Sequence, residues 1–409
     1  MSRELLILEK LENELNLKQL QIKSLLTITQ AINDNLPSDG LFNMYRSFLS
    51  WEMGIEHMVL FVKNNIDDDW EAVTSINVEQ KTVKTLIPLI LPFKRLYTVK
   101  TEDASELQKF DVIIPVYHKS DPIAYSLIGG IRDKDDLYNK IQFITTITNI
   151  IAVAIENKRL FKKQIKQERY NREMELASEV QQMLIPGETP ESKYFKMGMI
   201  YLPNYDVGGD YLDFIKLEKD KYAFCIADIS GKGVAAALLM ANFQAIIQSL
   251  IFQFRDLETF VFALNESVYK ITKSDKFITF FIAEIDGNEK KMRYINAGHF
   301  PPILYQDGEI KLLKSGTTVI GAFDKLPFIN EEKIDLSKDA NIFCFTDGLV
   351  DLMNDEKNYF GEERVIEFVK ENHKLEPDEL NKKLMIEIEN FKGSQEYVDD
   401  IAILSIQIN

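Results

Sequence analysis

The stretch Tyr222-Ala-Phe-Cys-Ile-Ala-Asp-Ile-Ser-Gly-Lys-Gly233 is an apolar run that ends in Asp228 and continues into a turn with two glycines. A continuous apolar run of this length is typical of a buried strand, and helical periodicity follows from Val234 onward. An apolar strand that ends in aspartate places a carboxylate at the edge of a sheet. The stretch therefore predicts a strand, a tight turn and a helix, with an acid at the junction.

Three more acidic motifs are associated with apolar runs, and they are Gly208-Gly209-Asp210, Thr346-Asp347-Gly348 and Asp399-Asp400. If several such strand ends converge, their carboxylates can hold hard divalent cations through oxygen ligands alone. The four histidines have no paired ligand spacing, which disfavours a zinc site. The leading hypothesis is therefore metal-assisted hydrolysis of a phosphate ester.

Bulk composition excludes several classes of protein. A chain of 409 residues predicts two or three domains, and 45% apolar with 27% charged residues is ordinary for a globular protein. A net charge of −16 argues against general nucleic-acid binding. The most apolar long stretch, residues 143–155, is shorter than the ~20 residues of a membrane span. With two cysteines and no signal-peptide pattern at Met1, we expect a cytoplasmic protein.

The hydrophobic pattern predicts four segments. Residues 1–36 form an N-terminal helix that ends at Leu36-Pro37, and residues 37–142 form a β-rich domain against which helices from residue 20 and up to residue 155 pack. Residues 143–189 form a helical linker, and residues 190–409 form the last domain. Because the linker is mostly charged from Lys158 to Glu175, it favours a two-chain coiled coil and hence a homodimer, with a solvated surface helix as the alternative.

The last domain alternates strands with helical blocks. Strands are expected at residues 197–202, 222–227, 277–285, 292–296, 302–305, 341–345 and 401–408, and helices at 234–254, at 257–273 and in two shorter runs between 363 and 391. Runs of strands with helices gathered between them favour a layered α+β domain over a Rossmann sheet.

Six motifs occur in order along the C-terminal half, and their set is more specific than any one of them. They are Glu179-Val-Gln-Gln-Met-Leu-Ile-Pro186, Val207-Gly-Gly-Asp-Tyr-Leu-Asp-Phe214, Ala227-Asp-Ile-Ser-Gly-Lys-Gly-Val-Ala-Ala-Ala237, Asn296-Ala-Gly-His-Phe-Pro-Pro302, Phe345-Thr-Asp-Gly348 and Val398-Asp-Asp-Ile401. Together they closely resemble the bacterial SpoIIE/RsbU-type branch of the PPM serine/threonine phosphatases. The resemblance covers roughly residues 175–409.

The resemblance implies an αββα sandwich with two Mn²⁺ or Mg²⁺ ions at one end, where an activated water attacks phosphorus. By motif position, Asp228 bridges both metals, the Ile229 carbonyl binds one of them, and Asp210, Asp347 and Asp399 complete the ligands. Residues expected to support these ligands or to contact substrate are Asp213, Asp400, Gly209, Gly231, Lys232, Gly233, Asn296 and His299. A structural role in holding a loop remains open for the Asn296 to His299 motif.

The resemblance also suggests a partner and a mode of control. The usual substrate in the family is a phosphoserine or phosphothreonine on a small STAS-domain regulator of an anti-sigma factor. The helix–β–helix order of residues 20–155 is similar to a GAF-type sensory domain that receives an unknown small molecule or protein signal. Two departures are Ala402, where the family commonly has Thr, and the lack of an obvious phosphate-gripping Arg upstream of Asp210.

Two other functions compete with the phosphatase hypothesis. Gly208-Gly209-Asp210 imitates the start of the diguanylate cyclase signature, but Tyr211-Leu212 does not supply its Glu-Phe, and five motifs would be left unexplained. A catalytically silent protein that sequesters a partner would be expected to lose ligands, whereas this acidic set is intact. A lone Asp-Gly is usually a turn, so the prediction depends on the ordered set.

Overall fold

The computed structural model describes residues 3–64, 69–131, 137–187, 192–204 and 206–409. The chain divides into two compact units, Met1–Glu168 and Arg169–Asn409. Helix α4 (Leu137–Gln182) contributes residues to both units. None of the helices in these ranges combines enough length with enough apolar character to cross a membrane.

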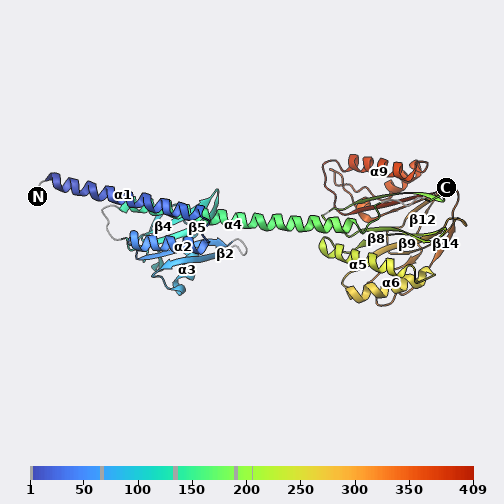
Figure 1. Ribbon diagram of the computed structural model, residues 1–409, viewed down its shortest axis with the longest axis horizontal. Coiled ribbons are helices and arrows are strands. Elements are labelled where there is room, and N and C mark those ends of the chain that lie inside the picture. The colour runs from blue at the N-terminus through green and yellow to red at the C-terminus, as the bar shows by residue number, and fades with distance from the viewer. Residues whose placement is uncertain (1–2, 65–68, 132–136, 188–191, 205) are drawn as a thin grey trace. The chain divides into compact units, whose positions relative to one another are not determined.

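The N-terminal unit is built on one antiparallel sheet with the strand order β2-β1-β5-β4-β3. In chain order its elements are α1 (Arg3–Asn33), α2 (Ser38–Ser47), the short π-helix η1 (Phe48–Glu52), β1 (His57–Asn64), β2 (Asp69–Ile76), α3 (Gln80–Ile90), β3 (Tyr97–Thr98), the 3-10 helix η2 (Ser105–Leu107), β4 (Val112–His118), β5 (Asp121–Gly129) and the first half of α4. Figure 1 shows these elements in blue to green.

Both faces of this sheet are covered. One face packs on α1, α2 and α4 through residues such as Tyr45, Met58 and Ile147. The other face packs on α3 through Val59, Leu86 and Ile90. Helix α3 corrects the sequence prediction, which described this region only as short β-rich runs. Its apolar residues at a helical period of three and four pack on the sheet, and this periodicity prevails over the local β-rich composition.

The C-terminal unit contains the remaining elements. They are β6 (Phe195–Leu202), β7 (Tyr211–Glu218), β8 (Lys221–Ile229), α5 (Val234–Leu250), α6 (Leu257–Thr272), β9 (Ile278–Asp286), β10 (Lys291–Ala297), β11 (Ile303–Gln306), β12 (Glu309–Leu312), β13 (Gly316–Thr317), β14 (Glu332–Asp335), β15 (Asn341–Phe345), α7 (Asp347–Val350), α8 (Glu362–Asn372), α9 (Pro377–Lys392) and β16 (Ile401–Ile408). Sequence boundaries were accurate to within a few residues for most elements, but β7 and the short strands β12, β13 and β14 were not predicted.

Two sheets pack face to face in this unit. One has the order β13-β10-β9-β8-β7, with β14 also paired to β10, and the other has the order β12-β11-β15-β16-β6. A core that includes Phe224, Phe281 and Leu404 lies between the sheets. Helices α5 and α6 cover the outer face of the first sheet, and α7, α8 and α9 cover that of the second. This four-layer αββα arrangement, visible in Figure 1, confirms the predicted fold class.

The predicted boundary between linker and last domain, residues 189 and 190, lies outside the described residues. Within the described part, α4 ends at Gln182 and β6 begins at Phe195. The segment that carries Ile185 packs against the cores on both sides of the first sheet. The C-terminal end of α4 is therefore close to the sandwich that carries the acidic motifs.

Candidate active site

The alternation of side chains along the strands brings the acidic motifs to one end of the sandwich. On β8, Phe224 and Ile226 face the core between the sheets, so the next inward position is Asp228. On β16, Leu404 and Ala402 face the same core, and Asp400 continues that row beyond the strand. Asp228 and Asp400 lie at the same end of the sandwich, because the C-terminal end of β8 and the N-terminal end of β16 are both at that end.

Asp210, immediately before β7, is the most enclosed of these acids. It is 2% exposed, and its Oδ2 atom has no hydrogen-bond partner among the described residues. Burial, followed by the charge of Asp228, raises the pKa of Asp210 well above its usual range, while a hydrogen bond from Thr346 lowers it. The Tyr201 hydroxyl, which lies near Asp210 and Asp400, is likewise buried without a described partner. This end of the sandwich thus presents unsatisfied oxygen atoms.

Asp228 and Asp347 lie within electrostatic reach of each other. Burial and then the charges of Asp347, Asp399 and Asp400 raise the pKa of Asp228 to about 7. Asp347, the first residue of α7, has its pKa raised by burial and then by Asp399. The repulsion among these carboxylates is the electrostatic signature of a site that accepts cations.

Lys232 places a positive charge in the turn between β8 and α5. Its Nζ atom lies 2.7 Å from Asp399 Oδ2 and donates a hydrogen bond to the Val398 carbonyl at 3.0 Å. The Lys232 charge also lowers the pKa of Asp228 and of Asp347. Lys232 therefore compensates part of the acidic charge and joins the turn after β8 to the segment that precedes β16.

Asp400 and Gly209 hold the two acidic segments together. Asp400 Oδ1 accepts a hydrogen bond from the Asn204 N–H at 2.7 Å, and Oδ2 accepts one from the Gly209 N–H at 2.5 Å. A Cβ atom at Gly209 would lie 3.1 Å from the Ile229 carbonyl oxygen. Glycine at this position allows the backbone before Asp210 to approach the end of β8 closely.

Gln181, near the end of α4, forms two hydrogen bonds with the backbone of Gly208. Its Nε2 donates to the Gly208 carbonyl at 2.7 Å, and its Oε1 accepts from the Gly208 N–H at 2.9 Å. Gln181 is only 6% exposed. Gln181 belongs to the motif at residues 179–186, but the sequence does not indicate its role, because the contact is tertiary.

Asn296 and His299 form a buried loop next to the acidic end. The Asn296 amide donates to the His299 and Leu313 carbonyls, and Asn296 Oδ1 accepts from the His299 N–H at 2.8 Å. His299 Nδ1 lies 2.8 Å from the hydroxyl of Thr279, which pairs with Asp228 across β8 and β9. Burial lowers the pKa of His299 to about 4, so the imidazole is neutral at pH 7.

Asp213 lies on the opposite face of the sheet. Its Oδ2 atom accepts hydrogen bonds from the Tyr211 hydroxyl and from Gln248 of α5, both at 2.6 Å. These contacts place Asp213 between β7 and α5 and not among the converging carboxylates. Gly231 and Gly233, with φ angles of 107° and 69°, shape the turn that leads from β8 into α5.

The donor set suits a hard divalent cation. Among the described residues, no three carboxylate, imidazole or thiol side chains already form a closed metal cage. The raised pKa values of Asp210, Asp228 and Asp347 and the unsatisfied Asp210 Oδ2 nevertheless mark a place where a cation would relieve repulsion. The candidate ligand atoms of these side chains are all oxygens, which Mn²⁺ and Mg²⁺ prefer.

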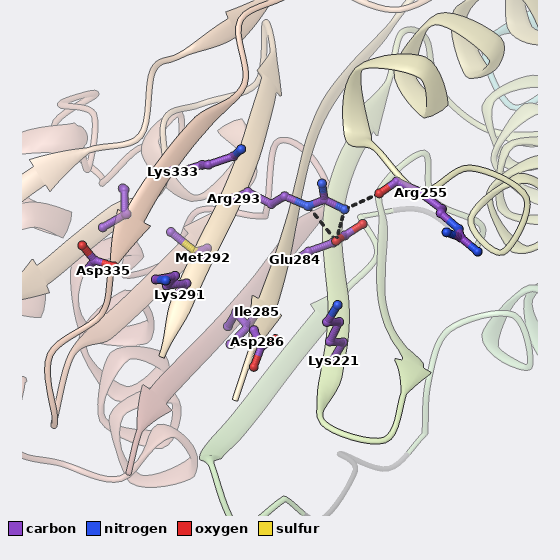
Figure 2. A pocket seen from close by; sticks show the side chains of 11 residues that line it. Lys221, Arg255, Glu284, Ile285, Asp286, Lys291, Met292, Arg293, Lys333 and Asp335 are labelled. Carbon is purple, nitrogen blue, oxygen red and sulfur yellow. Dashed lines mark hydrogen bonds and ion pairs between the residues drawn. The ribbon is translucent and has the colours of Figure 1, made fainter. Parts of the chain in front are cut away.

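A second feature, a cavity of about 500 Å³, lies at the other end of β8, next to Lys221 (Figure 2). Its charges compensate one another across the strands. Arg293 pairs with Glu284 at 2.6 Å and also donates to the Arg255 carbonyl, as the dashed lines in Figure 2 indicate. Lys221 is the strand partner of Asp286. We interpret this cavity as a charged sheet surface, because its main charges are paired across the strands, whereas the carboxylates of the acidic end are buried close to one another.

Comparison with known proteins agrees with this architecture. The family model described as "Stage II sporulation protein E (SpoIIE)" matches residues 218–409. The chain is 27% identical over 219 residues to phosphoserine phosphatase RsbU of Bacillus subtilis, covering 53% of this chain and 64% of RsbU. It is 26% identical over 186 residues to phosphoserine phosphatase RsbP of the same organism, covering 44% of this chain and 45% of RsbP. The chain thus spans less than two thirds of either relative.

The solved SiaA-PP2C domain of Pseudomonas aeruginosa shares the fold, with a TM-score of 0.54 at 19% identity, covering 60% of this chain and 99% of that domain. The C-terminal unit therefore has the fold of the PP2C class of phosphatases. Within that class it is a SpoIIE-type domain, homologous to RsbU and RsbP. The family prediction for this half of the chain is confirmed.

Proposed function

We propose that the chain is a metal-dependent serine/threonine phosphoprotein phosphatase. The observation that carries this proposal is the gathering of Asp210, Asp228, Asp347 and Asp399 at one end of the sandwich, where their charges interact. The relatives RsbU and RsbP are named as phosphoserine phosphatases, which supports the same chemistry here.

In this proposal Asp228 would be the ligand shared by two Mn²⁺ or Mg²⁺ ions, and Asp210, Asp347, Asp399 and the Ile229 carbonyl would supply the other ligands. Bound cations would supply charge neutralisation and the activation of water for attack on a phosphate ester. Side chains that would not bind the metals position and balance the ligands. Asp400 holds the Gly209 backbone and thereby fixes Asp210, and Lys232 offsets the charge of Asp399.

The substrate that we infer is a phosphoserine or phosphothreonine on a STAS-type regulatory protein. The names of the two Bacillus relatives support the phosphoserine part of this inference. The STAS type rests on the family resemblance of the six motifs.

The test is manganese-dependent turnover of p-nitrophenyl phosphate and of a phosphoserine peptide by the full chain. We expect turnover that is lost on chelation and in Asp228→Asn, and retained in Asp206→Asn, which alters an exposed acid of the preceding loop. Equal turnover in wild type and Asp228→Asn would refute the metal assignment. If manganese binds but neither substrate is hydrolysed, the silent sequestering function replaces this proposal.

We further infer that the N-terminal unit is a GAF-like sensory domain that controls this site through α4. A five-stranded antiparallel sheet of order β2-β1-β5-β4-β3, with helices on both faces, supports the first part. The two hydrogen bonds from Gln181 to Gly208 support the second, because they connect α4 to the segment that carries Asp210.

We also infer that α4 pairs with a second copy of the chain. Phe161, Leu176 and Val180 are 62%, 54% and 60% exposed on this helix, although apolar side chains favour burial. A parallel two-helix contact would cover them. The molecular mass in solution, measured by light scattering for wild type and for Phe161→Glu, tests this inference, since a monomeric wild type would contradict it.

A further inference from the structure

A phosphate group that approaches the acidic end meets several carboxylates, so the site needs positive charge at its rim. Lys232 is the obvious candidate, but its ammonium is already engaged by Asp399 at 2.7 Å and by the Val398 carbonyl at 3.0 Å. The sequence also shows no obvious phosphate-gripping arginine upstream of Asp210. Another cation close to the turn after β8 would fill this role.

Lys276 lies in the segment between α6 and β9, where it is fixed to the turn that follows Asp228. The Ser230 N–H donates to the Phe277 carbonyl at 3.0 Å. The Phe277 N–H donates back to the Ser230 hydroxyl at 3.0 Å. These two hydrogen bonds hold the backbone next to Lys276 against the turn and leave its side chain free to extend along it.

The Lys276 ammonium lies against Gly231. A Cβ atom built at Gly231 would be 3.0 Å from Lys276 Nζ, so a larger residue there would displace the ammonium. The φ angle of 107° at Gly231 also requires glycine. The Lys276 side chain is half-buried, and no carboxylate within the described residues forms an ion pair with it. Within the described residues, its ammonium is therefore not tied up in an ion pair at the turn where the acidic site begins.

We propose that Lys276 is a substrate-binding residue that contacts the phosphoryl group of the phosphoprotein. This proposal rests on the proposed phosphatase function of the same site. A lysine ammonium offers three donors as a compact charge, which suits phosphate oxygens that arrive from a variable direction. Lys232 balances the carboxylates, and Lys276 attracts the anion.

The test compares Lys276→Met with two matched variants in the full chain. Lys276→Arg keeps the positive charge, and Lys273→Met removes an exposed charge at the end of α6, three residues earlier. The first measurement is the affinity of the manganese-loaded protein for inorganic phosphate by calorimetry. The second is KM and kcat for p-nitrophenyl phosphate.

We expect Lys276→Met to weaken phosphate binding and to raise KM by about tenfold, as for the loss of one charge-assisted hydrogen bond. The value of kcat should change far less, and manganese affinity should be unaltered. Lys276→Arg should restore most of the phosphate affinity, and Lys273→Met should match wild type.

Unchanged phosphate affinity in Lys276→Met would overturn the proposal, and so would an altered manganese affinity, which would assign Lys276 to the metal site. A wild-type protein that binds no phosphate would also overturn it. If phosphate binding depends on Lys276 but no substrate is hydrolysed, the anion site stands and the proposed phosphatase function fails. The two proposals are thus separable.

Discussion

The side-chain amide of Gln181 forms a two-point contact with the backbone of Gly208, donating to its carbonyl at 2.7 Å and accepting from its N–H at 2.9 Å. Gly208 is two residues from Asp210, and a Cβ atom at Gly208 would lie 2.7 Å from Asp400 Oδ2. The last turn of α4 therefore helps to set the position of the most enclosed carboxylate of the site.

Replacing Gln181 by alanine leaves a buried N–H and a buried carbonyl of Gly208 without their side-chain partners. Such groups cost about 1–3 kcal/mol each when unsatisfied, so we expect faster hydrogen exchange at residues 207–210 and a clear loss of manganese-dependent turnover. Gln182→Ala, at the exposed neighbouring position, is the control and should behave as wild type. Equal exchange and turnover in the two variants would show that the contact does not support the site.

Local patterns predicted most of the C-terminal fold because its strands are apolar runs between turns. Strand β7 was missed because Asp213 and Lys216 interrupt its apolar pattern. The structure explains Asp213 as a hydrogen-bond acceptor for Tyr211 and Gln248, a tertiary contact that no local pattern indicates. In the N-terminal unit, α3 was not predicted because it is a short helix between β-rich runs, whose composition hid its helical period.

A side chain at Gly209 is predicted to force a local shift of its neighbours. A Cβ atom there would lie 3.1 Å from the Ile229 carbonyl oxygen and 3.4 Å from Ala236 Cβ, so Gly209→Ala should push Asp210 away from the end of β8. Overpacking of this kind costs about 1–3 kcal/mol, which calorimetric unfolding of the metal-free chain can measure. Manganese affinity should fall as well.

Gly187→Ala is the matched control, because nothing lies within 4 Å of a Cβ atom at that position. It should leave both stability and manganese affinity unaltered. If Gly209→Ala resembles this control, the close approach of Gly209 to β8 is not required for the site.

The identities of the acidic residues followed from their motifs, and the alternation along β8 explains why Asp228 faces the interior. Tyr201 and Lys276 could not be found this way. Tyr201 reaches the site because β6 pairs with β16 and places it opposite Ala402. Lys276 reaches it because Phe277 and Ser230 bond across two loops. Both positions depend on contacts between segments that are distant in sequence.

Asp228 makes the metal-free chain less stable as pH rises. Burial and its acidic neighbours raise its pKa from 3.8 to about 7 in the folded state, so between these values the folded chain binds more protons than the unfolded chain. The Asp228 contribution to stability is therefore largest at low pH and is lost as pH rises toward 7.

We expect Asp228→Asn to flatten this dependence, with a melting temperature above that of wild type at pH 8 and a smaller difference at pH 5. Thermal unfolding in the presence of a chelator checks this, and Asp206→Asn, at an exposed position, should keep the wild-type slope. Parallel pH profiles for wild type and Asp228→Asn would contradict the electrostatic account of the site.

Lys232 is expected to set the pH at which the site accepts a cation. Its charge lowers the pKa of both Asp228 and Asp347, and it holds Asp399 at 2.7 Å. In Lys232→Met both pKa values should rise, so manganese should bind more weakly than to wild type at pH 6.5. At pH 8.5, above the pKa of about 7 that Asp228 has in wild type, protonation of Asp228 opposes binding far less, and Asp399, now free of its partner, should make the variant bind at least as tightly.

We therefore expect manganese titrations to show that Lys232→Met binds manganese more weakly than wild type at pH 6.5 and at least as tightly at pH 8.5. Lys219→Met removes an exposed lysine between β7 and β8, at the opposite end of these strands, and should follow wild type at both values. Weaker binding by Lys232→Met at both pH values would instead mean that Lys232 is needed to hold the turn in place, because loss of the turn geometry cannot be reversed by ionising the carboxylates.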